Sequence, residues 1–170
     1  MEVLEAIKTR RSIRRYKKAP VPEELIEKIL DAGRWAPSSK NAQPWKFIVL
    51  RDSEVRRNLS ELLPYGKFLA ETPLGIAVIV DPSVSSRPVE DGAAVTENML
   101  LAAHALGLGA CWIGSYGIAN EGKVKDVLGV PREQRLLSVI ALGYADESPQ
   151  ARSRKSLSEI AFNDRYGKRV

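Results

Sequence analysis

A long helical pattern of alanine and leucine at residues 89–106 is the sequence feature that most constrains the fold. It is apolar over much of its circumference and stops at Gly107, a residue type that is common just after a helix end. A helix that is apolar on several faces normally lies at the centre of a protein. Because the chain has only 170 residues, we expect a second subunit to be needed to bury this helix fully. The pattern is the first indication of a dimer.

Helical and strand patterns alternate along most of the chain, which predicts a mixed fold, α/β or α+β. No internal repeat or domain boundary interrupts them, and we expect residues 1–170 to form a single domain. Apolar residues at helical spacing predict further helices at residues 2–9, 22–34, 54–63 and 121–128, with a single turn at 157–162. Short apolar runs predict strands at residues 46–50, 75–80, 110–113 and 136–142.

The charge balance of the chain is basic. A net charge of +5 and an isoelectric point of about 9.4 favour an anionic partner, such as a nucleic acid, a membrane surface or a phosphorylated small molecule. The N-terminus opens into an amphipathic pattern without the apolar stretch of a signal peptide. Every apolar run is far shorter than the roughly 20 residues that a membrane helix needs. We therefore expect a soluble, cytoplasmic protein.

The single cysteine and the single histidine exclude an intramolecular disulfide and argue against a metal site. Cys111 lies in an apolar run and is interpreted as a small buried residue. His104 lies among alanine and leucine residues, and we expect it to be buried in the core of the long helix. The sequence offers no nucleophile triad and no acidic motif. If the chain is an enzyme, its chemistry belongs to a cofactor.

Two clusters of basic residues lie near opposite ends of the chain. Residues 8–18 hold seven lysines and arginines together with Ser12, and residues 151–156 hold Arg152, Arg154 and Lys155. Arginine presents a planar fork of donors that suits phosphate, and its charge persists at any relevant pH. For the first cluster, charge density alone supports phosphate binding and a solvated charge run or nucleic-acid arm about equally. For the second cluster, the alternative to phosphate binding is a solvated tail.

Two further segments have the composition of a ligand site. The loop at residues 36–45 places Ser38, Ser39, Asn41 and Gln43 between two prolines, and such groups suit the polar edge of a heterocycle. Taken alone, an ordinary cluster of turn residues is the better interpretation of this loop. Residues 107–117 place four glycines around a short apolar strand, where backbone can approach a flat ligand. The alternative there is a helix end followed by a turn.

Taken together and in this order, these segments resemble the nitroreductase family. The similar motifs are RRSIRRY (10–16), APSSKNAQPWKFIVL (36–50), ENMLLAAHALGLGACWIG (97–114) and RSRKSLSEI (152–160). The resemblance implies an α+β fold with a central, mainly antiparallel sheet and helices on both sides. It also implies an intertwined homodimer that binds FMN at its interface, with the long helix at the interface and the C-terminal tail adding an edge strand to the partner.

The resemblance also implies which residues contact FMN. Arg10, Arg11 and Ser12 would hold the phosphate and ribityl chain, with Arg152 and Arg154 completing the phosphate clamp and Arg14 near the pyrimidine edge. Pro37, Ser38, Ser39 and Asn41 would contact the flavin from the other subunit, and Ile113 and Gly114 would lie along the ring with a backbone N–H near N5. Lys67 is a further candidate contact. The chain lacks the insertion that covers the active site in larger members of the family.

The function that the resemblance implies is ping-pong transfer of hydride from NADH or NADPH, through flavin N5, to nitroaromatic or quinone-like acceptors. No catalytic side chain is assigned. One alternative is another flavin enzyme on the same fold, such as a reductive dehalogenase, a dehydrogenase or a flavin-fragmenting enzyme. A non-enzymatic nucleic-acid binder is disfavoured, because the basic residues do not alternate with aromatics and the aromatic fraction is only 6%.

Overall fold

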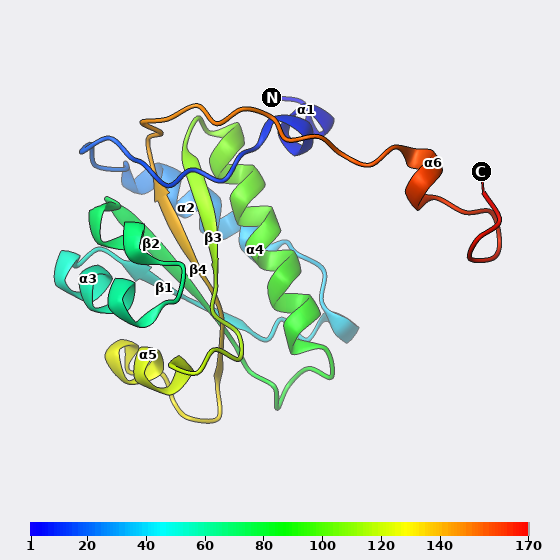
Figure 1. The fold of residues 1–170 in the computed structure, drawn as a ribbon. Coiled ribbons are helices and arrows are strands. Elements are labelled where there is room, and N and C mark those ends of the chain that lie inside the picture. Colours follow the sequence, from blue (N-terminus) through cyan, green and yellow to red (C-terminus); the bar gives the residue numbers. More distant parts are fainter. Residues whose placement is uncertain (170) are drawn as a thin grey trace.

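The arrangement of the chain is shown in Figure 1, where a computed structural model describes residues 1–169. The helices and strands follow the order predicted from the sequence, with short 3₁₀ helices in two of the connections. Their bounds are α1 Val3–Thr9, α2 Glu23–Arg34, η1 Ser39–Asn41, β1 Trp45–Leu50, α3 Ser53–Leu62, η2 Lys67–Glu71, β2 Leu74–Val80, α4 Pro88–Ala105, β3 Gly109–Gly114, α5 Glu121–Leu128, β4 Arg135–Gly143 and α6 Leu157–Ile160.

The four named strands form one sheet in the order β1-β2-β4-β3. All three pairings between them are antiparallel. The two central strands are buried along almost their whole length, because both of their faces are covered. A continuous apolar run is typical of such a strand. The predicted α+β fold with an antiparallel sheet is confirmed.

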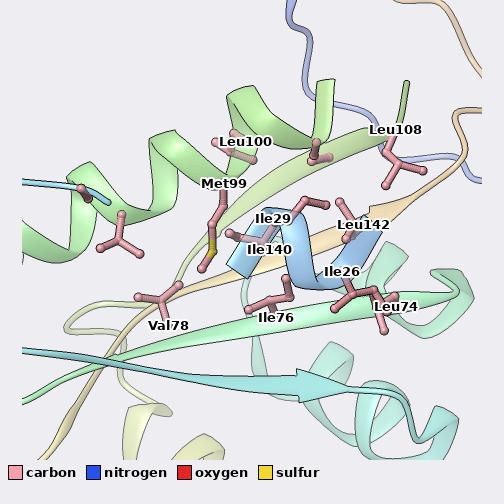
Figure 2. Packing of buried hydrophobic residues seen from close by; sticks show 14 of the residues in the cluster. Ile26, Ile29, Leu74, Ile76, Val78, Met99, Leu100, Leu108, Ile140 and Leu142 are labelled. Carbon is pink, nitrogen blue, oxygen red and sulfur yellow. The ribbon is translucent and has the colours of Figure 1, made fainter. Parts of the chain in front are cut away.

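Helices cover both faces of the sheet, and alternate residues of each strand point to opposite layers. On one face, Ile76 of β2 packs with Ile29 of α2 and Met99 of α4, as Figure 2 shows. On the other face, Ala77 packs with residues of α3, η2 and α5, among them Leu59. This period of two fixes the register of the sheet, because a shift by one residue would exchange the two layers.

The long helix α4 packs closely against α2 but keeps one side partly open. An added Cβ at Gly33 of α2 would lie only 2.4 Å from Cε of Met99, so the two helices approach closely at this glycine. On its other side, Leu101, Ala102 and Ala105 of α4 line a shallow apolar cavity of about 250 Å³ together with residues of α1. The helix ends as predicted, with Gly107 in the left-handed conformation at φ 81°.

The basic arm between α1 and α2 is tied to the body of the protein at several points. The backbone N–H of Ile13 donates to the carbonyl of Ala110 in β3 at 3.0 Å, and Lys17 N–H donates to the carbonyl of Tyr144 at 2.9 Å. Beyond residue 150 the C-terminal tail leaves the body, and Figure 1 shows α6 lying away from the sheet. Among the helices of residues 1–169, none is both long and apolar enough to cross a membrane.

Candidate functional site

The two basic clusters meet in one cavity, although they lie near opposite ends of the chain. This cavity has a volume of about 210 Å³. It is lined by Arg10, Arg11, Ser12, Arg14, Pro149, Gln150, Arg152 and Arg154. We call it the basic cavity. Five arginines line this small space, and a bound anion would offset the repulsion between their charges, so the arrangement favours a bound anion over a solvated charge run.

Arg10 carries the clearest sign of a missing ligand. Its Nε is buried and has no hydrogen-bond partner within residues 1–169. The carboxylate of Glu97 lies nearby, with 3.6 Å between Arg10 Nε and Glu97 Oε1, which is an ion pair but too long for a hydrogen bond. A buried donor without an acceptor costs free energy, whereas a phosphate oxygen would satisfy it. The residues of the basic cavity therefore fit a phosphate group.

Glu147 holds the arm in place beside the basic cavity. Its Oε1 accepts hydrogen bonds from the backbone N–H groups of Arg14, at 2.5 Å, and of Arg15, at 3.1 Å. These backbone bonds, the one from Arg14 first, hold the pKa of the Glu147 carboxyl below its usual range despite some opposing desolvation. The sequence analysis missed this residue, because its partners lie more than 130 positions away and no local pattern marks it.

The loop predicted to contact flavin has an unusual backbone. Three residues that are not glycine have positive φ, namely Lys40 at 52°, Asn41 at 57° and Gln43 at 47°. Such conformations are uncommon for residues with a side chain, and a cluster of them is often found at functional sites. The loop lines a cavity of about 430 Å³ formed by Arg34, Trp35, Ala36, Pro37, Asn41 and Gln43. We call it the loop cavity.

Within one chain, the loop and the basic cavity lie at opposite ends of α4. The loop is fastened to the first turn of the helix, where Asp91 accepts a hydrogen bond from Ser39 N–H at 2.9 Å. Two arginines of the basic cavity also line a neighbouring cavity with Leu100, His104 and Gly107, at the other end of the helix. The helix has 18 residues, so it is about 27 Å long. The structure therefore does not bring Pro37, Ser38, Ser39 and Asn41 together with the arginines of the same chain.

Ile113 and Gly114 lie at the end of β3, which is an edge strand of the sheet. The side chain of Ile113 is buried in the core, so only its backbone is available for a contact with a ligand. Gly114 is exposed, and an added Cβ would meet no atom within 4 Å. The backbone at the end of β3 is thus open to a flat group.

A buried carboxylate organises the loop that follows Gly114. Glu121 forms a bidentate ion pair with Arg135, in which both N–O distances are 2.8 Å. The same carboxylate accepts the backbone N–H groups of Gly117, at 3.1 Å, and Leu136, at 3.2 Å. The bond from Arg135, followed by these backbone bonds, holds the pKa of Glu121 below its usual range against the desolvation of the carboxyl. This residue was also absent from the sequence analysis.

Three single-residue expectations have mixed outcomes. Cys111 is buried, as predicted, and burial raises the pKa of its thiol. The expectation that His104 lies in the helix core is wrong, because its ring is only partly buried and Nε2 lies 2.8 Å from Oγ1 of Thr9. Partial burial, and then the positive charges of the arm, lower the pKa of His104. Lys67 begins η2 with an exposed side chain, and its flavin contact stays a prediction.

Comparison with known proteins identifies the family. The nitroreductase family profile matches residues 7–65 and 63–144. This chain belongs to the nitroreductase family. It is 46% identical over 157 residues to a protein of Methanothermobacter thermautotrophicus, provisionally named NADH dehydrogenase/NAD(P)H nitroreductase, covering 89% of this chain and 82% of the relative. The predicted family is thereby confirmed.

Two solved nitroreductases share the fold closely. An FMN-dependent nitroreductase of Clostridium difficile is 34% identical and superposes with a TM-score of 0.89, covering 95% of this chain and 99% of the other. A nitroreductase of Desulfovibrio desulfuricans, provisionally assigned and solved in complex with FMN, is 34% identical with a TM-score of 0.88 and 98% coverage of both chains. The likeness extends over nearly the whole chain, including the tail that carries the second basic cluster.

Proposed function

We propose that this nitroreductase is an FMN-dependent NAD(P)H oxidoreductase that works as a homodimer with FMN bound between its subunits. The observation that carries the proposal is the basic cavity, which gathers arginines from both ends of the chain. One of them, Arg10, has a buried Nε that finds no hydrogen-bond partner in the described part of the chain. The FMN complex of the Desulfovibrio relative supports the choice of FMN as the phosphorylated ligand.

In this proposal the basic cavity holds the phosphate. Arg10, Arg11, Arg152 and Arg154 supply charge and hydrogen bonds, and Ser12 supplies a hydroxyl donor. Arg14 lines the same cavity and would approach the pyrimidine edge of the ring, where a cation stabilises the negative charge that develops on reduction. The two basic clusters thus serve one purpose.

The proposed dimer is supported by the positions of the basic cavity and the loop at opposite ends of α4. A second chain that packs against the exposed apolar surface of α1 and α4 in a two-fold arrangement would bring its loop toward the basic cavity of the first. The exposed side chains of Val3, Leu4 and Ile7 add to this apolar surface. Each site would then take its arginines from one chain and Pro37, Ser38, Ser39 and Asn41 from the other.

Bound FMN would supply the hydride-transfer chemistry, and the protein residues bind it, orient it and tune its charge. An added Cβ at Gly114 would meet no atom within 4 Å, so the backbone there leaves room for the ring. In this proposal a backbone N–H at this end of the strand would lie near flavin N5. We assign no catalytic acid or base. The reaction proposed is ping-pong transfer of hydride from NADH or NADPH to nitroaromatic or quinone-like acceptors. The nicotinamide donor and the acceptor would bind in turn at the same open face of the flavin.

The test begins with the visible spectrum of the purified protein and the mass of any released cofactor. The proposal expects flavin absorption bands and release of FMN at about one per chain, with bleaching of the bands when NADH or NADPH is added. A colourless protein that also fails to take up added FMN would exclude it. A protein that binds FMN but is reduced by neither nicotinamide would instead be another flavin enzyme on the same fold.

A further inference from the structure

We infer that Asp91 is a positioning residue that holds the loop at residues 37–43 in its flavin-binding shape. The inference deepens the proposed function and rests on it, because the loop is taken to contact FMN held by the partner chain. Asp91 itself lies in the first turn of α4 and is expected to touch no part of the flavin. It acts through the backbone of Ser39.

The carboxylate of Asp91 is buried, and each of its oxygens accepts a hydrogen bond. Asp91 is only 5% exposed. One oxygen accepts the N–H of Ser39 at 2.9 Å, and the other accepts the hydroxyl of Ser85 at 2.5 Å. The hydroxyl oxygen of Ser85 in turn accepts the N–H of Arg87 at 3.0 Å, so the carboxylate joins the loop to the segment that enters α4. Hydrogen bonds to a buried charged acceptor are among the strong ones in proteins.

The loop needs such a fastening because its backbone is not one that its residues prefer. Lys40, Asn41 and Gln43 each have positive φ, which costs free energy for residues with a Cβ. These conformations persist only where surrounding contacts impose them. The bond to Asp91 enters the loop immediately before the first of them, and the bond from Gln43 N–H to Ser38 Oγ, at 3.0 Å, closes the loop from the other side. Loss of the carboxylate removes the bond that enters the loop before these residues, and we expect the loop to relax toward ordinary φ values.

The position of Asp91 also links the loop to the proposed subunit contact. The same helix carries Asp91 in its first turn and Leu101, Ala102 and Ala105 on its apolar exposed side. The loop is therefore placed relative to the helix that the partner would contact, rather than relative to the flavin site of its own chain. The bond between Asp91 and Ser39 would therefore orient the loop toward FMN held by the partner chain.

The experiment compares wild type with Asp91→Ala and Asp91→Asn in the full chain, well below the unfolding temperature of each. FMN affinity is measured by fluorescence titration, and loop opening by the rate of tryptic cleavage after Lys40. We expect Asp91→Ala to bind FMN about tenfold more weakly or worse, and to be cut faster at Lys40. Asp91→Asn keeps an oxygen that can accept the Ser39 N–H, so it should recover part of both losses.

Thr96→Val is the matched control. Thr96 is buried on the same helix and bonds to Ser138 Oγ at 2.9 Å, so its loss weakens the fold without touching the loop. It should leave FMN affinity within about twofold of wild type. Unchanged FMN affinity in folded Asp91→Ala would overturn the inference, whether or not Lys40 is cut faster. If wild type itself binds no FMN, the proposed function fails, and the cleavage rate alone then decides whether Asp91 holds the loop.

Discussion

Replacing Glu121 by glutamine tests whether one carboxylate fixes the loop beyond Gly114. The side chain of Glu121 is 11% exposed and that of Arg135 is 35% exposed. Besides the two bonds from Arg135, the carboxylate receives backbone N–H groups from Gly117 and Leu136. Glutamine has the same shape but only one acceptor oxygen, and its NH₂ group would face other donors. The substitution therefore leaves donors unsatisfied without creating a cavity.

The expected loss of unfolding free energy lies between the values for buried and for surface ion pairs. Breaking a fully buried pair costs about 3–5 kcal/mol, and an exposed pair contributes at most about 1 kcal/mol. Because Arg135 keeps about a third of its exposure, water screens its charge in part, and we expect Glu121→Gln to lower the free energy of unfolding by about 2 kcal/mol. For a chain of this size, that corresponds to a fall in melting temperature of about 4–8 °C.

The assay is urea unfolding at one fixed protein concentration, with Glu23→Gln as control. Glu23 forms an ion pair with Arg51 at 2.6 Å in which both side chains are more than half exposed, so its loss should cost less than about 1 kcal/mol. Equal losses for the two variants would refute the argument that burial and the backbone bonds give the Glu121 pair its strength.

The pH dependence of stability is a second measurement that tests the role of Glu121. The folded protein holds the pKa of Glu121 below its ordinary value of 4.5, mainly through the bond from Arg135. A carboxyl whose pKa is lowered on folding stabilises the protein above its unfolded pKa, and that contribution is lost as the pH falls through the lowered value. The stability difference between wild type and Glu121→Gln should be full at neutral pH and shrink in acid. A difference that grows in acid would contradict the assignment.

Three further predictions concern the core, the thiol and the arm. Gly92→Ala should destabilise the protein by about 1–3 kcal/mol in thermal unfolding, because the new Cβ would lie 2.5 Å from a methyl of Leu137; Gly122→Ala, with no atom within 4 Å, should not destabilise it. Burial raises the pKa of Cys111, so iodoacetamide should alkylate it slowly at neutral pH and rapidly in urea. Glu147→Ala should weaken FMN binding about tenfold in fluorescence titrations, because the oxygen that accepts the two arm N–H groups is lost.

Most of the fold was predictable from local patterns. The helix predicted at residues 89–106 is Pro88–Ala105, and the strand predicted at 75–80 is Leu74–Val80, because period and apolar length report burial directly. His104 shows the limit of this reasoning, since apolar neighbours in sequence do not decide on which side of a helix a residue lies. Its side of α4 faces Thr9 rather than the core.

The candidate site was predictable only in part. Its arginines were found because charge clusters are visible in sequence, and the structure brings both clusters to one cavity. Asp91, Glu121 and Glu147 were not found, since each acts on backbone N–H groups and leaves no trace in residue type near those groups. The positive φ values of Lys40 and Gln43 were equally invisible, because such residues adopt them only when tertiary contacts require it.

Mixing two variant chains tests the shared site most directly. Arg152→Glu combined with Arg154→Glu reverses the charge of the basic cavity, and Asn41→Trp fills the loop cavity from an exposed position. Each variant alone should bind little FMN. If each site combines the two chains, co-refolding the variants should restore FMN at about a quarter of the sites, because half of the dimers are mixed and each mixed dimer holds one intact site. No restoration in dimers shown to be mixed would contradict a flavin held between two subunits.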